Sequence, residues 1–202
     1  MINEFHKLTK SRNMKHFLHL LMLVMLPITA FAQTTIEGMT FYPNYNDYGE
    51  LDGTCNLGHV DSNLTDVKVP STVVIDGKDY TVTIIINHLF WHNKNIQTVF
   101  LPNTIKTIGY CAFGECENLR NINFPEGLEY IGDGSFRYCT SLNVPAFPST
   151  LKYIGDEAFQ ETSNITDLTI PAAVEYVGNG CFSNLYYLKK LTFEEGDIDL
   201  TI

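Results

Sequence analysis

The sequence has few basic residues for its length. Its 202 residues include 13 Lys and Arg against 23 Asp and Glu, which gives a formal net charge of −10. Nucleic-acid binding requires clustered Lys and Arg opposite phosphates, and anionic membrane surfaces attract basic segments, so we expect neither as a partner. Apolar residues still make up 45% of the chain, which excludes wholesale disorder.

Signatures of catalysis are also missing. The sequence contains no G-x-S-x-G motif, no P-loop and no dinucleotide-binding fingerprint. After residue 32 its only histidines are His59, His88 and His92. Carboxylates are numerous, so a catalytic acid pair stays open, but they are scattered as solubility requires. We therefore expect no enzyme and no cofactor.

Only one long apolar run is present. Residues 17–28, FLHLLMLVMLPI, carry no charge, follow Lys15 and precede the small-x-small sequence Ala30-Phe31-Ala32. This pattern is typical of a secretory signal peptide over residues 1–32, cleaved between Ala32 and Gln33, rather than of a buried amphipathic helix. We expect an exported protein (extracellular, cell-surface or periplasmic) that does not insert into a membrane once the signal is removed.

A period of 23 residues dominates the rest of the chain. Glycine, phenylalanine and proline each recur four times at this spacing: Gly109, Gly132, Gly155, Gly178; Phe113, Phe136, Phe159, Phe182; Pro102, Pro125, Pro148, Pro171. A unit this small cannot bury its own apolar face, so copies must stack into a solenoid. Each L-x-x-[hydrophobic]-x-F segment predicts a short strand, in the ranges 64–69, 96–101, 119–124, 142–147, 165–170 and 188–193.

These patterns predict three segments. Residues 33–63 do not fit the period and are interpreted as a small N-terminal β cap, after the signal peptide of residues 1–32. Residues 64–202 form the repeat array, with units near 64–101, 102–124, 125–147, 148–170 and 171–193 and a partial unit 194–202. Within the first unit, Asp76-Gly77 between β-branched residues predicts a hairpin turn.

The repeats resemble the BspA-type leucine-rich repeats of bacterial surface proteins. The resemblance lies in IGYCAFGECENL (108–119), IGDEAF (154–159) and the preceding VPSTV (69–73) and GKDYTV (77–82), and it covers about residues 64–193. It implies a leucine-rich-repeat solenoid that is β-rich, with short strands joined by turns or short helical segments. It also implies secretion or surface exposure and a binding role. The third unit departs from the pattern because Pro145 stands where Ile122 and Leu168 lie, so its strand is expected to be broken or bulged.

The five cysteines leave two interpretations open. Cys116 and Cys139 share one column of the repeat, so their Cα atoms should lie about 5 Å apart, within reach of a disulfide. Alternatively they are structural thiols, as Cys181 is expected to be, since it replaces Ala112 and Ala158. We expect no metal site, because His88 and His92 lack the H-E-x-x-H pattern and no His pair matches the C-x(4)-C sequence.

The candidate ligand-binding residues are three tyrosines. Tyr130, Tyr153 and Tyr176 recur at the 23-residue period, between two columns of core residues. Exposed tyrosines can stack on sugars or anchor a peptide, although the same row is explained by Tyr packing on Tyr. The preceding column alternates in charge and predicts a register-setting ladder: Lys106, Glu129, Lys152, Glu175. Small polar residues of the predicted strands form a second candidate surface: Asn121, Asn123, Asp167, Thr169, Thr192.

The sequence therefore predicts a secreted or cell-surface binding module that recognises an extracellular protein or glycan through a face of the repeats, without catalysis. The alternative is a structural subunit that assembles through its open C-terminal repeat edge. Asp197 and Asp199 alternate with apolar residues there, which either blunts the edge or lets it pair with a partner. We expect a monomer or weak self-association.

Overall fold

The structure, a computed structural model, describes residues 32–162 and 164–194. Residues 33–202 form one compact unit. The predicted signal peptide lies outside the described residues except for Ala32, so the cleavage site at Ala32 and Gln33 stays a prediction, and Asp197 and Asp199 are also outside. Within the described ranges, no helix is long and apolar enough to cross a membrane.

The first three strands form an antiparallel cap. They are β1 (Thr34–Ile36), β2 (Met39–Tyr45) and β3 (Leu51–Val60). Between β1 and β2, Glu37 and Gly38 adopt φ angles of 50° and 77°, as a tight type I′ hairpin turn requires. Strand β3 then pairs in parallel with β6 (Lys78–Ile85), so the cap continues directly into a nine-stranded sheet of the repeat array.

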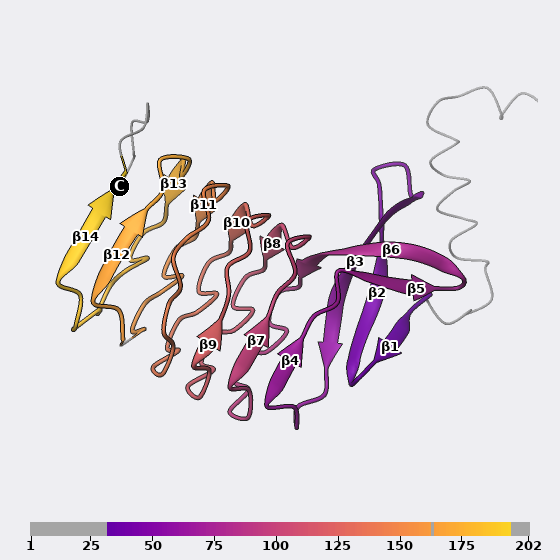
Figure 1. The fold of residues 1–202 in the computed structure, drawn as a ribbon, viewed down its shortest axis with the longest axis horizontal. Helices are drawn as coiled ribbons and strands as arrows, with labels where there is room; N and C mark the ends of the chain where they lie inside the picture. The colour runs from indigo at the N-terminus through magenta and orange to yellow at the C-terminus, as the bar shows by residue number, and fades with distance from the viewer. Residues whose placement is uncertain (1–31, 163, 195–202) are drawn as a thin grey trace, which may run out of the picture. The chain divides into compact units, whose positions relative to one another are not determined.

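The predicted hairpin in the first repeat is confirmed. Strand β5 (Thr72–Ile75) pairs antiparallel with β6, and Asp76 and Gly77 between them have φ angles of 49° and 75°. The far end of β6 pairs with β8 (Thr107–Ile108), the first of four two-residue strands in this sheet. The hairpin therefore joins the cap to the regular turns (Figure 1).

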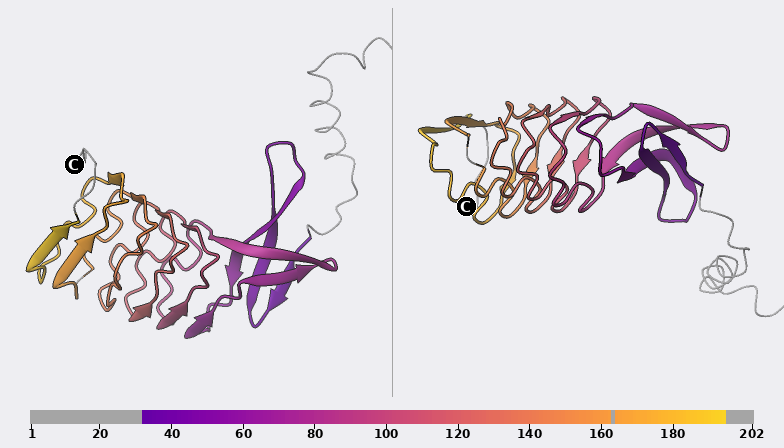
Figure 2. Two further views of the ribbon diagram at one scale, coloured as in Figure 1. Left: turned by 45° about the horizontal axis from the view of Figure 1, so that its top comes forward. Right: turned by 90° about the horizontal axis from the view of Figure 1, so that it is seen from below.

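Two rows of parallel strands run along the array (Figures 1 and 2). One row continues from β8 through β10 (Tyr130–Ile131), β11 (Tyr153–Ile154) and β13 (Tyr176–Val177). The other contains β4 (Asp66–Lys68), β7 (Thr98–Phe100) and β9 (Asn121–Ile122), and then, as a separate sheet, β12 (Asp167–Ile170) and β14 (Lys190–Phe193). The strands of this second row are the ones that the L-x-x-[hydrophobic]-x-F segments predict, and each is shorter than its predicted range.

Turns, not helices, close each coil in the described residues, and they stack by their own hydrogen bonds. The backbone N–H of His88 donates to the C=O of Tyr110 (2.9 Å), and that of Phe90 to Ala112 (2.8 Å). Two positions of every turn are left-handed, with φ between 47° and 62°: 88, 111, 134, 157, 180 and 92, 115, 138, 161, 184. A third ladder of backbone hydrogen bonds thus holds successive coils together.

A column of phenylalanines fills the centre. The rings of Phe90, Phe113, Phe136 and Phe159 stack with centroids 4.8–5.3 Å apart and planes within 10° of parallel. All four side chains are buried. Each such pair contributes roughly 0.5–1.5 kcal/mol to the stability of the fold, beyond the effect of burying the rings. The recurring phenylalanines therefore contribute much of the stability of the array.

The repeated glycines are needed for close approach rather than for backbone conformation. Gly109, Gly132, Gly155 and Gly178 do not have positive φ. A Cβ built on Gly132 would lie 2.8 Å from the Gly109 carbonyl carbon and the Tyr110 nitrogen of the previous coil. At Gly132 the neighbouring backbone therefore leaves no room for a side chain.

The third unit lacks the strand expected at 142–147. A single bridge between Asn121 and Asn143 is all that remains of the ladder there. Sheet pairing stops at β9 and resumes at β12 (Figure 1). The expected disruption at Pro145 is confirmed, because proline has no N–H to donate to a ladder.

Candidate ligand-binding surface

The three tyrosines predicted from the period form a continuous stack, named here the tyrosine column (Tyr130, Tyr153 and Tyr176). Strands β10, β11 and β13 pair in parallel with these residues in register. Successive ring centroids lie 4.4 and 4.6 Å apart, with planes within 10° of parallel. Inward-facing Ile131 and Ile154 are buried beneath the strands, which directs the tyrosines outward.

Stacking limits what the tyrosine column can contact. Each ring face between two tyrosines is covered by its neighbour, so ring edges, hydroxyl groups and the outer faces of the end rings are what remain for a ligand. Tyr130 is 37% exposed, whereas Tyr153 and Tyr176 are half-buried. A sugar cannot lie flat on the middle ring. The column instead offers a row of phenol hydroxyls on an apolar edge, which suits hydrogen-bonded contact with a glycan or a peptide.

An acidic residue fixes one end of this row. The Tyr176 hydroxyl donates to Oδ1 of Asp156 (3.1 Å), which also accepts the backbone N–H of Asn179 (2.7 Å). This hydrogen bond raises the pKa of Tyr176, and burial raises the pKa of Tyr153. Both phenols therefore stay neutral at physiological pH. Because the Tyr176 hydroxyl already donates its one hydrogen to Asp156, it offers a ligand only an acceptor.

The predicted charge ladder runs beside the tyrosine column. The ammonium of Lys106 lies 3.1 Å from one carboxylate oxygen of Glu129, and that of Lys152 lies 3.4 Å from the other. Hydrogen bonding to Lys106 is the main cause of the lowered pKa of Glu129. Because all three side chains are exposed, the ladder is a weak register device. No ion pair joins Lys152 to Glu175 among the described residues.

Both candidate disulfide cysteines are free thiols in the structure. The Sγ of Cys116 donates to the C=O of Phe90 (2.9 Å), and the Sγ of Cys139 donates to the C=O of Phe113 (3.0 Å). Thr162, in the same column, makes the equivalent bond to Phe136 (3.0 Å). The Cys116–Cys139 bond is therefore not formed here. Each residue of the column supplies a hydrogen-bond donor to the previous coil, a thiol at Cys116 and Cys139 and a hydroxyl at Thr162.

The two histidines of the first repeat do not share a helical face. His88 and His92 occupy the two left-handed turn positions, and His92 Nδ1 pairs with Glu115 (2.8 Å). His88 packs against Trp91 and Tyr110, with centroids 5.1 and 4.9 Å apart. In the described parts of the chain, no group of three or more His, Cys, Asp or Glu residues is placed to hold a metal. The sequence did not predict the exposed aromatic cluster that His88 forms with Trp91 and Tyr110.

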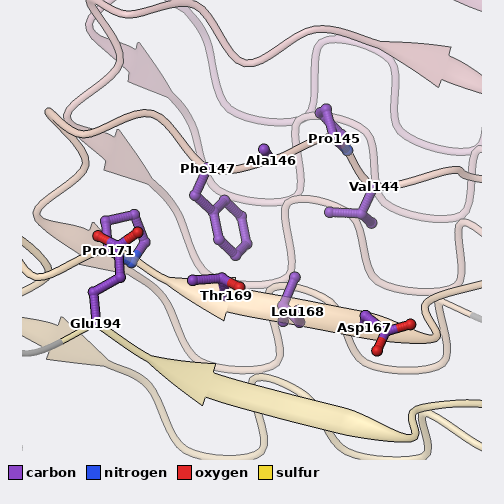
Figure 3. Close-up of a pocket in the computed structure, with 9 residues that line it drawn as sticks. All are labelled: Val144, Pro145, Ala146, Phe147, Asp167, Leu168, Thr169, Pro171 and Glu194. Carbon is purple, nitrogen blue, oxygen red and sulfur yellow. The ribbon is translucent and has the colours of Figure 1, made fainter.

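The second candidate surface, along the strands, is divided. Asn123 is not available to a ligand, because its amide bonds both the N–H (2.7 Å) and the C=O (2.8 Å) of Leu101. Asp167 and Thr169 instead face a hollow of about 260 Å³ beside the missing strand, named here the third-turn hollow (Figure 3). Its lining combines apolar residues of the third unit with residues of β12: Val144, Pro145, Ala146, Phe147, Asp167, Leu168, Thr169, Pro171, Glu194.

Sequence comparison identifies the family. The profile of the BspA type leucine rich repeat region matches residues 83–200 in six copies. The chain therefore belongs to the BspA-type leucine-rich-repeat family, and the resemblance inferred from the repeats is confirmed. No curated protein sequence matches the chain significantly.

Solved structures of bacterial leucine-rich-repeat proteins share the fold. A leucine-rich repeat protein from Bacteroides ovatus is 27% identical, with a TM-score of 0.70 over 80% of this chain and 42% of its own. A leucine rich cell surface protein from Faecalibacterium prausnitzii is 24% identical, with a TM-score of 0.68 over 85% of this chain and 44% of its own. The chain spans less than half the length of these two proteins. A T. pallidum leucine rich repeat protein also aligns, at 20% identity and a TM-score of 0.60 over 82% of this chain and 85% of its own.

Proposed function

We propose that this chain is a secreted or cell-surface binding module that recognises an extracellular protein or glycan through the tyrosine column, without catalysis. The observation that carries the proposal is the column itself, in which three stacked phenols present their hydroxyls and edges along one side of the array. A cell-surface location of the F. prausnitzii protein supports the export that the N-terminal segment predicts.

A binding screen tests this proposal. Purified residues 33–202, which form one compact unit, are presented to immobilised glycans and extracellular-matrix proteins. Binding should be saturable and should weaken when Tyr130, Tyr153 and Tyr176 are all changed to Ala. The triple Tyr→Phe variant is the matched control, because it keeps the ring stack and removes only the hydroxyls.

The two variants separate the kinds of contact. If hydroxyls make the contacts, the Phe and Ala variants lose binding alike; if ring edges make them, only the Ala variant does. Binding that persists unchanged in a folded triple Ala variant would overturn the role of the tyrosine column and move the candidate surface to the strands.

A second candidate function is assembly through the C-terminal repeat edge. The last described turn exposes four large apolar side chains: Tyr186, Tyr187, Leu191 and Phe193. Exposed apolar residues beside a sheet edge favour pairing with another chain. Sedimentation at high protein concentration tests it, and a strictly monomeric profile would exclude assembly of this kind.

A further inference from the structure

Strand β12 has one paired and one unpaired edge. On the paired edge, the N–H of Lys190 donates to the C=O of Thr166 (3.2 Å), and the N–H of Glu194 to the C=O of Ile170 (2.9 Å). Alternate residues of a parallel strand direct their backbone groups to opposite sides. Residues 168 and 170 therefore face β14, and residues 167 and 169 face the third unit.

The groups that face the third unit have no partner. Among the described residues, no hydrogen bond involves the backbone N–H or C=O of Asp167 or Thr169. Pro145 explains this, since it occupies the position equivalent to Leu168, whose backbone faces the following strand. Its missing N–H is the group that would reach β12.

The third unit also stays close to β9 rather than β12. At one end, the N–H of Asn143 donates to the C=O of Arg120 (3.1 Å). At the other, Phe147 stacks on Phe124 (5.7 Å between centroids). Between these attachments the chain passes Pro145 and leaves the third-turn hollow open against β12 (Figure 3).

The charged side chains around the third-turn hollow indicate which kind of ligand it accepts. The two ionisable side chains in its lining, Asp167 and Glu194, are both acidic and exposed. Lys190 is the register partner of Asp167 on β14, but no ion pair joins them among the described residues. The rim therefore favours a cationic group beside the unpaired backbone edge.

We propose that the third-turn hollow docks an extended segment of a partner protein that carries Lys or Arg. Two N–H and two C=O groups, on Asp167 and Thr169, recur at a two-residue interval, which is the repeat of an extended peptide backbone. A segment pairing with β12 fills the place of the missing ladder. One of its basic side chains lies near the carboxylate of Asp167 and another near that of Glu194, because these two carboxylates stand at opposite ends of the hollow (Figure 3). This is β-strand addition at a gap inside the array, separate from the tyrosine column.

Hydrogen exchange and peptide binding test this site on residues 33–202. The probe is a fluorescein-labelled hexapeptide of alternating Val and Lys. The control peptide alternates Pro and Lys: it has the same charge, but each Pro lacks a backbone N–H and has a fixed φ, which disfavours pairing as a strand. The amides of Asp167 and Thr169 should exchange rapidly in the free protein and slow on addition of the Val-Lys peptide alone. Protected amides in the free protein, or equal binding of both peptides, would overturn the proposal.

Two variants complete the test. P145V restores the missing N–H and should weaken peptide binding at least about tenfold, whereas P102V, a proline change far from the hollow, should leave it unchanged. If P145V does not fold, D167N/E194Q decides, because these isosteric changes remove only the rim charge and should also lower affinity by about tenfold. Wild-type affinity in either folded variant would contradict the proposed site.

Discussion

Cys139 and Thr162, one coil apart, make the same hydrogen bond with different chemistry. The thiol of Cys139 donates to the C=O of Phe113 and the hydroxyl of Thr162 to the C=O of Phe136, each at 3.0 Å and with both side chains fully buried. The column thus selects a small donor that ties each coil to the one before it, not a cysteine as such. A thiol is the weaker donor but fills the space as an apolar side chain does.

This equivalence predicts the effect of two substitutions at Thr162. Thr162→Val keeps the shape and removes the donor, so unfolding free energy should fall by about 0.5–1.5 kcal/mol. Thr162→Cys keeps a donor and should lose less. Urea unfolding of both variants measures the difference, and a Cys variant as unstable as the Val variant would show that the column does not need a donor.

The buried thiols predict a loss of stability in alkali. Burial raises the pKa of Cys116 and of Cys181 to about 12 from the ordinary value of 9.0. Below pH 9 the thiols are protonated in both folded and unfolded chains and stability does not depend on them. Above pH 9 the unfolded chain loses these protons first, so each thiol lowers the unfolding free energy as the pH rises toward 12.

Cys181→Ala isolates one thiol, because Ala112 and Ala158 occupy the same column. Between pH 8.5 and 10, wild type should lose about 1 kcal/mol more unfolding free energy than this variant does, since one pKa unit corresponds to about 1.4 kcal/mol. Urea unfolding at the two pH values gives the comparison. Parallel losses in both proteins would show that Cys181 does not resist ionisation when folded.

The sequence predicted the parts of the fold that depend on one residue type recurring at the 23-residue period. Gly132, Phe136 and their equivalents fixed the coil length, and Pro145 marked the coil in which the ladder fails. The two-residue strands such as β10 were not predicted as strands, because a pair of residues gives no alternation to detect. The spacing of Tyr130 and Tyr153 placed the rings side by side, but spacing carries no information on ring orientation.

Other features depended on backbone conformation that spacing does not reveal. His88 and His92 are four residues apart, as on one helical face, yet both lie in left-handed turn positions. The third-turn hollow was also beyond sequence reasoning: Pro145 indicated a break, but the side on which space opens depends on where Phe147 packs.

Two glycines should respond differently to substitution. Gly77 has a φ of 75° with nothing within 4 Å of a built Cβ, so Gly77→Asn should change unfolding free energy by less than about 0.5 kcal/mol, since Asn tolerates this conformation. Gly132→Ala forces backbone atoms of the previous coil to move and should cost about 1–3 kcal/mol. Thermal unfolding ranks the two variants, and the opposite order would refute the close-approach argument.

Tyr153 should stabilise the array even where no ligand is present. Its ring stacks on both Tyr130 and Tyr176, and each aromatic pair contributes roughly 0.5–1.5 kcal/mol beyond burial. Tyr153→Ala removes both contacts and should lower unfolding free energy by about 1–3 kcal/mol, whereas Tyr153→Phe keeps the stack and should remain within about 0.5 kcal/mol of wild type. Chemical denaturation measures both.

The Tyr153→Ala and Tyr153→Phe variants also test ligand binding. A Phe variant that is stable but binds less tightly assigns the Tyr153 hydroxyl to recognition, because its stacking is unchanged. If Ala and Phe variants are equally stable, the stack contributes nothing to the fold. The three tyrosines of the column would then have no structural role to explain their recurrence, which would strengthen their assignment to a ligand.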